Sequence, residues 1–314
     1  MIRWCLAIAV LVLVLFGARE AQAAPLCTAT IGNVNFGSPD LLGGAQVDVT
    51  ATVSVSCTGA HPQDVAACVG FNAGGGGVSG STRRMSAGGG TTLDYALYRD
   101  SARTLLWGSR TTASFGSPAS ITLSGGSPKT GTAVIYARLL SGQTAGAPGT
   151  YSSSFSGANT YAVMAPRSSS SCTSDQGGET MPSFQVLATP GANCIFTLSP
   201  LAFGTRAGTV QVHDASTPLG VRCTNSTAYS LALGNGQTGT GPTTRRMTNG
   251  ANFLIYGLYQ DLARANPWGA AAGAVQGGTG TGAAQSFTIY GRTPSQPTPA
   301  NGTYTDQVVV TATY

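Results

Sequence analysis

Charged side chains are scarce in this chain, and the carboxylates and imidazoles that many enzymes use are scarcer still. Only 9% of the 314 residues are Asp, Glu, Lys or Arg, and Lys129 is the one lysine. Beyond residue 23 a single glutamate remains, Glu179, and the histidines are His61 and His213. The paired carboxylates of a glycoside hydrolase have no recognisable position, and no G-x-S-x-G sequence provides a nucleophile. We therefore expect no catalytic residues and no enzyme.

Metal-binding and nucleic-acid-binding patterns are missing as well. No C-x-x-C pair accompanies the histidines, so we expect no zinc site, no other metal and no cofactor. The net charge of +5 rests on arginines that form no cluster larger than an Arg-Arg pair, which argues against nucleic acid as a partner. The G-x-G-x-x-G pattern from Gly234 to Gly239 is followed by Pro242 rather than by a helix, so it indicates a turn.

The first 23 residues have the pattern of a cleaved signal peptide. Arg3 precedes an apolar run from Leu6 to Phe16, and Ala21-Gln22-Ala23 forms a cleavage site of the A-x-A type. The apolar run is shorter than the roughly 20 residues that cross a bilayer. We expect an exported chain that begins at Ala24.

The composition of the remaining chain is typical of an all-β protein. Glycine is abundant, at 44 residues, and Ser, Thr and Gly clusters separate short apolar segments. The segment AQVDVTATVSVSC, residues 45–57, alternates apolar and polar side chains, as expected for a strand with one face in a core. Short antiparallel strands must bury their apolar faces against a second sheet, so β-sandwiches are the expected architecture.

The chain contains an internal duplication. STRRMSAGGGTTLDYALYRD, residues 81–100, returns as TTRRMTNGANFLIYGLYQD, residues 243–261, and Trp107-Gly108 returns as Trp268-Gly269. A period of about 160 residues is too long for a solenoid, so each copy should have its own core. We expect a first domain at 24–165, a linker at 166–193 and a second domain at 194–314.

Six cysteines remain beyond the signal peptide, and an even number in an exported chain indicates disulfides. They are Cys27, Cys57, Cys68, Cys172, Cys194 and Cys223. The first pair and the last pair occupy matching places in the two copies, so we expect bonds within each pair. Cys68 and Cys172 have no counterparts in the second copy, so we expect them to bond to each other.

The repeated Arg-Arg-Met sequences allow two interpretations. Arg83-Arg84 and Arg245-Arg246 could bind anionic ligands, because guanidinium groups match carboxylate and phosphate geometry. Alternatively they could be structural, with an arginine satisfying an aspartate or loop carbonyls. Their presence at the same place in both copies favours the structural role.

The order of the repeated words resembles the spore coat protein U domain. The shared words are Cys, NFG or AFG, Cys-Thr, Arg-Arg-Met, Leu-x-Tyr-x-Leu-Tyr-x-Asp, Trp-Gly and a terminal GTYTDQVVVTATY. The resemblance implies two immunoglobulin-like, pilin-type sandwiches in tandem, the C-terminal one lacking a strand, in a subunit of an archaic chaperone-usher pilus. It implies a periplasmic chaperone, an outer-membrane usher and the donor strand of the next subunit as partners.

Two segments have alternating apolar side chains, one suited to border the groove that receives a strand and the other resembling a donor strand. Val308, Val310, Ala312 and Tyr314 lie at every second position at the end of the second copy, as expected for the strand that borders the open groove and meets the chaperone. Phe184, Val186 and Ala188 alternate in the same way within the linker, where they either complete the first domain in cis or form part of the linker. Residues 24–26 leave no donor segment ahead of Cys27, so we expect a position at the pilus tip, outside the cell.

We expect the first copy to carry adhesion to an abiotic or host surface and to support biofilm formation. Leu41, Leu42, Leu105 and Leu106 lie in turn-rich stretches and have no leucine counterparts in the second copy. They form either an exposed apolar tip or a slightly larger core. The alternative functions are a non-adhesive structural pilus or spore-coat subunit and a secreted carbohydrate-binding sandwich.

Overall fold

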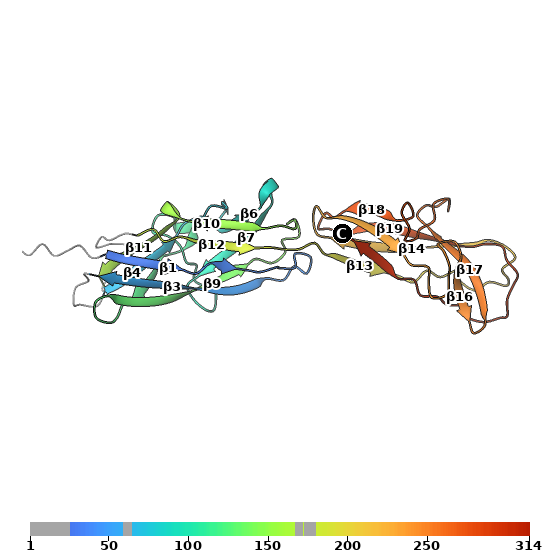
Figure 1. Cartoon of the computed structure of the whole chain (residues 1–314), viewed down its shortest axis with the longest axis horizontal. Helices are drawn as coiled ribbons and strands as arrows, with labels where there is room; N and C mark the ends of the chain where they lie inside the picture. The colour runs from blue at the N-terminus through green and yellow to red at the C-terminus, as the bar shows by residue number, and fades with distance from the viewer. Residues whose placement is uncertain (1–25, 59–64, 167–171, 173–179) are drawn as a thin grey trace, which may run out of the picture.

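The computed structural model describes residues 26–58, 65–166, 172 and 180–314. The expected signal peptide, His61 and Glu179 lie outside the described residues. Figure 1 shows two β-rich domains arranged end to end. No helix within the described ranges is long and apolar enough to cross a membrane.

Strands of two sheets build the first domain. They are β1 (Leu26–Ile31), β2 (Val34–Asn35), β3 (Val47–Thr58), β4 (Val65–Phe71), β5 (Val78–Ser79), β6 (Thr82–Ser86), β7 (Thr92–Tyr98), β8 (Ala119–Thr122), β9 (Lys129–Leu139), β10 (Tyr151–Phe155), β11 (Thr160–Pro166) and β12 (Phe184–Ala188). The larger sheet has the order β1-β3-β9-β7-β6-β10-β12-β2, with β5 beside β6, and the smaller sheet has the order β11-β4-β8. Short 3-10 turns lie at Gly88–Gly90, Ala113–Phe115 and Gly157–Asn159.

The second domain repeats most of this plan. Its strands are β13 (Cys194–Leu198), β14 (His213–Cys223), β15 (Ala228–Leu233), β16 (Arg245–Asn249), β17 (Asn252–Tyr259), β18 (Gln276–Thr279), β19 (Gln285–Thr293) and β20 (Val310–Thr313). The larger sheet has the order β13-β14-β19-β17-β16, and the smaller sheet has the order β18-β15-β20. The all-β, two-sandwich architecture expected from the sequence is confirmed.

Side-chain alternation explains how these strands form a core. β3 pairs with β9 along its whole length, from Val47 opposite Leu139 to Cys57 opposite Lys129. Within β3, Val53 and Val55 are buried, whereas Thr52 is exposed and Ser54 is partly exposed. Successive side chains of a strand point to opposite faces, so one face of β3 faces the core and the other faces solvent.

β12 belongs to the first domain. It pairs antiparallel with β10, from Phe155 opposite Phe184 to Tyr151 opposite Ala188, and parallel with β2. The first domain therefore continues through Ala188 rather than ending at residue 165. The segment that joins the domains is 189–193, shorter than the linker at 166–193 expected from the sequence.

The second domain has no strand in the place of β12 among the residues that the structure describes. In the first domain β10 contacts β6 through Ser152 opposite Ser86, and β12 follows on the other side of β10. In the second domain Thr305 contacts β16 through a bridge to Thr248, but the sheet ends there. One copy of the repeat is thus a complete sandwich, and the other lacks one strand.

Three disulfides cross-link strands and loops within the two sandwiches, and they join the pairs expected from the sequence. Cys27 bonds to Cys57 across β1 and β3, and Cys194 bonds to Cys223 across β13 and β14. The third bond joins Cys68 in β4 to Cys172. In the first two pairs the cysteines face each other directly in the strand register, with Cα atoms 4.0 and 4.1 Å apart.

Candidate functional site: an open strand groove in the second domain

The place of β12 in the first domain shows what an inserted strand contributes there. Phe184, Val186 and Ala188 all point into the core and are at most 4% exposed. The ring of Phe184 stacks on Phe155 at 4.5 Å between centroids and meets the edge of Phe71 at 5.1 Å. The sequence left open whether these residues complete the first domain in cis or belong to the linker. In the structure they complete the first domain in cis.

A groove lies at the corresponding place in the second domain. Two adjoining cavities of ≈ 550 and ≈ 590 Å³ share Leu201, Phe203, Met247 and Tyr304 among their lining residues. The first cavity is also lined by Leu198, Thr217, Leu233, Tyr256, Leu258, Ile289, Asp306, Val308 and Val310. Apolar side chains that would form a core if one more strand were present therefore line an open cavity.

The C-terminal segment forms one wall of this groove. Val308, Val310 and Ala312 are partly buried against the core of the second domain, and β20 pairs with β15. Val309 points the other way and is 64% exposed. Of the four residues expected at the groove, Val308 and Val310 line the first cavity. Ala312 packs against the core without lining either cavity, and Tyr314, beyond the strand, is 55% exposed.

The two copies can be compared residue by residue along this wall. In the first domain Tyr151, Ser153 and Phe155 point inward and are at most 1% exposed under β12. The repeat places Tyr304, Asp306 and Val308 at the same positions, and all three are partly exposed. The side chains that β12 covers in one copy are thus accessible in the other.

Asp306 is the one carboxylate among the described residues that line the groove, and it was not predicted from the sequence. Its Oδ2 accepts a hydrogen bond from the Tyr256 phenol at 2.7 Å, and its Oδ1 accepts from the backbone N–H of Gln237 at 2.9 Å. Burial is the main cause that raises the pKa of Tyr256, and the hydrogen bond to Asp306 adds to it. The carboxylate therefore faces a neutral phenol and has no arginine in direct contact among the described residues. The register of the repeat is the signal that could have located it.

Comparison with known proteins places these observations in a family. The sequence profile of the Spore Coat Protein U domain matches residues 12–157 and 180–311, which is most of the chain. The chain belongs to the Spore Coat Protein U domain family. Protein U of Myxococcus xanthus is 34% identical over 103 residues, and this match covers 31% of the chain and 58% of that protein's length.

Solved structures match this chain at low sequence identity. The CsuC–CsuE chaperone–tip adhesion subunit pre-assembly complex from archaic chaperone-usher Csu pili of Acinetobacter baumannii matches with a TM-score of 0.55 and 16% identity. The match covers 92% of this chain and 100% of that chain. The CupB6 tip adhesin of Pseudomonas aeruginosa matches with a TM-score of 0.40 and 12% identity over 92% of this chain and 94% of its own.

The Arg-Arg-Met sequences of this Spore Coat Protein U chain have a structural role in both copies. The guanidinium of Arg83 is buried and donates hydrogen bonds to the backbone carbonyls of Phe71, Asn72 and Trp107 at 2.7 to 2.9 Å. Arg245 does the same in the second copy, with its partners being the carbonyls of Leu233, Gly234, Pro242 and Trp268. Neither guanidinium has room for an anionic ligand.

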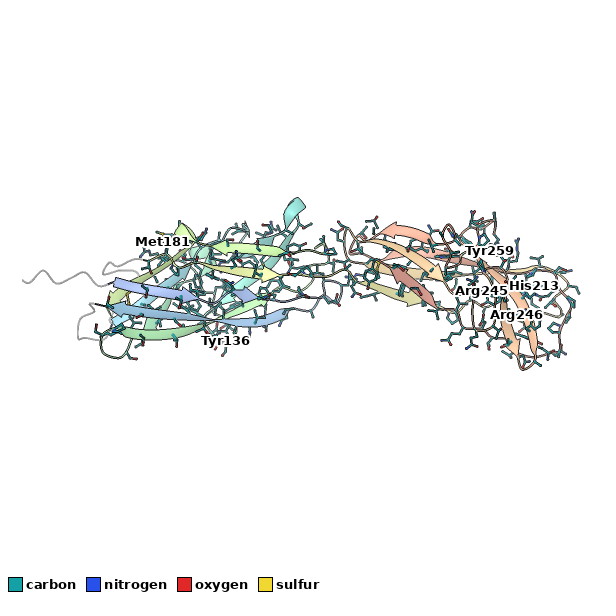
Figure 2. The ribbon with its side chains drawn as sticks, viewed as in Figure 1. Tyr136, Met181, His213, Arg245, Arg246 and Tyr259 are labelled. Atoms are coloured by element: carbon teal, nitrogen blue, oxygen red, sulfur yellow. A yellow bond between two sulfur atoms is a disulfide. The ribbon has the colours of Figure 1, made fainter. Side chains whose placement is uncertain are left out.

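The second arginine of each pair lies nearer the surface. Arg84 forms an ion pair with Asp94 at 3.0 Å, and both side chains are about one-third exposed. Arg246 packs instead over the ring of Phe253, with its guanidinium carbon 4.6 Å from the ring centre. Figure 2 shows Arg245 and Arg246 close together in the second domain.

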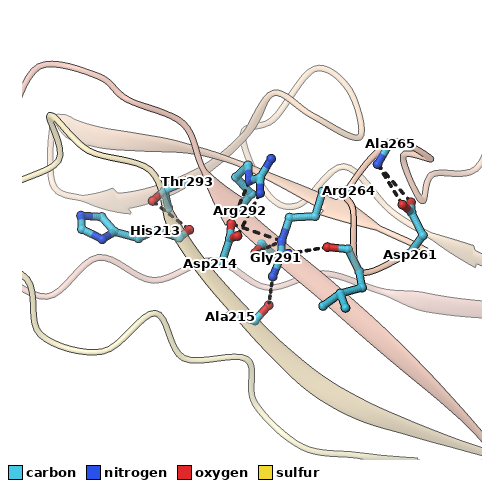
Figure 3. Close-up of polar contacts among 10 residues, drawn as sticks. His213, Asp214, Ala215, Asp261, Arg264, Ala265, Gly291, Arg292 and Thr293 are labelled. Carbon is cyan, nitrogen blue, oxygen red and sulfur yellow. Dashed lines mark hydrogen bonds and ion pairs between the residues drawn. The ribbon is translucent and has the colours of Figure 1, made fainter.

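A second repeated cluster anchors the loop that precedes each tryptophan. Asp214 pairs with Arg292 at 2.8 Å and with Arg264 at 3.2 Å, as Figure 3 shows. Asp261 accepts hydrogen bonds from the backbone N–H groups of Ala265 and Asn266 and thereby fixes the turn. In the first copy, the corresponding residues are Asp48, Arg138, Arg103 and Asp100. The repetition indicates architecture rather than a ligand site.

The expected exposed leucine tip is wrong for two of its four residues. Leu41 is 5% exposed and Leu42 is 3% exposed, so both pack inward. Leu106 is partly buried and pairs with Tyr98, and only Leu105, at 50%, is exposed. The burial of Leu41 follows from the core it joins, since it packs in the main cluster of the first domain.

Leu41 and Leu42 do not lie at the end of the first domain remote from the second. Gly44, next to Leu41-Leu42, accepts a hydrogen bond at its carbonyl from the N–H of Gly142, which places the two loops together. The second of these loops contacts the second domain, because Asn225 donates to the carbonyl of Ala145 at 2.8 Å. Leu41 and Leu42 thus lie at the end of the first domain that faces its neighbour.

The described residues offer no side-chain cluster suited to metal binding. No three His, Cys, Asp or Glu side chains gather there in a way that could hold a metal ion. His213, at the start of β14, has a ring nitrogen 3.0 Å from the carbonyl of Gly208.

Proposed function

We propose that this chain is an exported subunit of an archaic chaperone-usher pilus and that its second domain receives a β-strand from a partner. A periplasmic chaperone fills the groove first, and the donor strand of the next subunit replaces it at the outer-membrane usher. The groove supplies main-chain hydrogen-bonding positions and apolar pockets, which are the two requirements of recognition by strand addition.

One observation carries this proposal. The chain itself fills the site in its first copy, where β12 inserts between β10 and β2, and leaves the same site open in its second copy. The family match and the fold shared with a chaperone-bound tip adhesion subunit support the same conclusion.

The physical chemistry of the groove makes a partner necessary. Partly buried apolar side chains such as Met247, Val308 and Val310 line it, and water in contact with them weakens the core. The open edge also leaves backbone groups unpaired, which invites association with other chains. We expect the chain without a partner strand to aggregate.

The arrangement of the domains supports a place at the pilus tip. β12 completes the first domain and leads through five residues, 189–193, into the second domain. In the same way, a donor strand that completed the second domain would lead into the body of the next subunit. The end of β20 lies on the side of the first domain in Figure 1. A strand that filled the groove in the direction of β12 would therefore lead away from the first domain and leave it at the free end.

We further propose that the first domain, at this free end, attaches the pilus to an abiotic or host surface and so supports biofilm formation. Leu41 and Leu42 are buried and do not contribute to that surface. Immunogold labelling should find this chain at pilus tips, and labelling distributed along the shaft would contradict the tip position.

Capture by a chaperone provides the direct test of the groove. Co-expression with a periplasmic chaperone of an archaic chaperone-usher pilus should give a soluble one-to-one complex. The double variant V308S/V310S should lose this complex, because both side chains face the groove. V309S is the matched control, since Val309 lies between them and points to solvent.

The outcome that would contradict the proposal is equally clear. Soluble, monomeric wild-type chain in the absence of any chaperone would show that the groove needs no partner. Equal capture of V308S/V310S and V309S would show that the groove is not the binding site.

A further inference from the structure

The two copies differ at the centre of the inserted strand's site. In the first domain, Ser153 lies directly opposite Val186 of β12 and is 1% exposed. Its Oγ accepts a hydrogen bond from the N–H of Gly76 at 3.2 Å. The second domain has Asp306 in the place of Ser153, and there the corresponding loop donates through Gln237. A neutral hydroxyl in the filled site is thus replaced by a carboxylate in the open one.

Filling the groove would change the surroundings of this carboxylate. Asp306 lines the cavity and is partly exposed to water while the groove is open. Its hydrogen bonds come from Tyr256 and from the N–H groups of Gln237 and Gln307. A strand in the position of β12 would cover it as β12 covers Ser153. A carboxylate has about four acceptor positions, so one direction is left for the incoming strand.

We propose that Asp306 selects the donor strand, favouring one whose middle inward residue carries a hydrogen-bond donor. This inference rests on the proposed function, in which a partner strand fills the groove. A strand with Thr, Ser, Asn or Lys at that position supplies the missing hydrogen bond. A strand with an apolar residue there would bury the charge with one acceptor position unpaired, which is costly.

The same residue would make the groove discriminate against the strand that the chain already contains. β12 presents Phe184, Val186 and Ala188 to its site, and its middle residue is apolar. Asp306 would therefore disfavour insertion of β12 from a second copy of this chain into the groove. Specificity that depends on an unfavourable contact with the wrong strand is a general means of choosing partners.

Two peptides and three proteins test the proposal. The peptides have the sequence of residues 182–190, one with Val at position 186 and one with Thr, which has nearly the same shape. The full chain with its disulfides intact, as wild type, D306S or D306N, is diluted from denaturant into each peptide. The soluble fraction as a function of peptide concentration gives an apparent affinity without any chaperone.

The expected result is a change in preference among the three proteins. Relative to D306S, the wild type should favour the Thr peptide over the Val peptide by about ten-fold or more, as for a buried acceptor that gains a partner. D306S restores the serine of the first copy and should take the Val peptide at least as well as the Thr peptide. D306N, which removes the charge but keeps the shape, should lie between them.

Each failure has its own meaning. The same Thr-to-Val ratio in wild type, D306S and D306N would overturn the role of Asp306 while leaving strand insertion intact. If neither peptide keeps wild type or D306N soluble at any concentration, the groove does not accept such strands, and the proposed function itself is contradicted. If D306S fails to refold with either peptide, the comparison of wild type with D306N decides the question.

Discussion

Arg83 and Arg245 each satisfy backbone carbonyls at the point where strands of the two sheets meet the tryptophan loop. Buried carbonyls need donors, and a guanidinium offers five N–H groups in a fixed planar arrangement. The cost is the burial of a positive charge, which lowers the pKa of Arg83 to about 10 and leaves the group protonated at neutral pH. The repeated Arg-Arg-Met sequence is therefore explained by hydrogen bonding within each sandwich.

Replacement of the buried arginine should destabilise its domain strongly. R83A leaves three carbonyl groups without donors, and at about 1 kcal/mol or more for each we expect a loss of about 3 kcal/mol or more. Hydrogen–deuterium exchange of β4 and β7 peptides in the full chain should show faster exchange in the first domain and no change in the second.

R84A is the matched control for this prediction. The ion pair of Arg84 with Asp94 is partly exposed, and such pairs contribute at most about 1 kcal/mol. Equal exchange in R83A and R84A would contradict the structural role assigned to Arg83.

The aspartates that anchor the tryptophan loops should make stability depend on pH. The hydrogen-bonded guanidinium of Arg138 lowers the pKa of Asp48, and Arg292 does the same to the pKa of Asp214. Because the pKa is lower in the folded state, the stabilisation is present above the unfolded value of about 3.9 and is lost as pH falls through the folded value. In D48N and D214N the free energy of unfolding should fall less steeply than in the wild type as the pH drops below about 4. Acid unfolding followed by circular dichroism measures this. An unchanged acid profile in both variants would contradict this assignment.

At the scale of the elements, β12 decides which domain is complete. Its alternating apolar residues were visible in the sequence, but a segment of five residues can pair with any accessible edge of suitable register. The structure has it between β10 and β2, with Phe184 packed against Phe155 and Phe71. The short segment 189–193 then carries the chain directly into β13.

Truncation of β12 side chains should destabilise the first domain alone. F184A removes a buried aromatic ring from a cluster of three, and losses of about 3–5 kcal/mol are typical of such changes. Urea-dependent proteolysis of the full chain should cleave the first domain at lower urea while leaving cleavage of the second unchanged. Q185A, on the exposed face of the same strand, should behave as the wild type. A second domain that responded to F184A as strongly as the first would contradict the assignment of β12.

At the scale of the whole molecule, the two copies should differ in their need for a partner. A fragment that ends at Ala192 retains β12 and should fold as a soluble monomer without a chaperone. A fragment that ends at Pro182 lacks β12 and should aggregate like the second domain, because it exposes the same site. Size-exclusion chromatography after expression without a chaperone distinguishes the two. Aggregation of the longer fragment would show that β12 does not suffice to complete the first domain.

Local pattern and repetition in the sequence were enough to predict the architecture. The period-2 alternation of residues 47–57 predicted a half-buried strand, and the duplicated words predicted two sandwiches with separate cores. The disulfide pairs followed from the matching places of Cys27 and Cys194 in the repeat. These features depend on contacts between neighbours in sequence or on equivalence between copies, both of which can be read along the chain.

The tertiary structure alone decided the features that depend on packing at a distance. Leu41 and Leu42 looked free for an adhesive tip, but they are buried because the first-domain core and a neighbouring loop cover them. The role of Phe184 became definite only when its ring was found beside Phe155, and Asp306 became notable only because it occupies the place of Ser153 beneath a missing strand. Apolar alternation specifies that one face of a segment is buried, but what covers that face depends on where the rest of the chain lies.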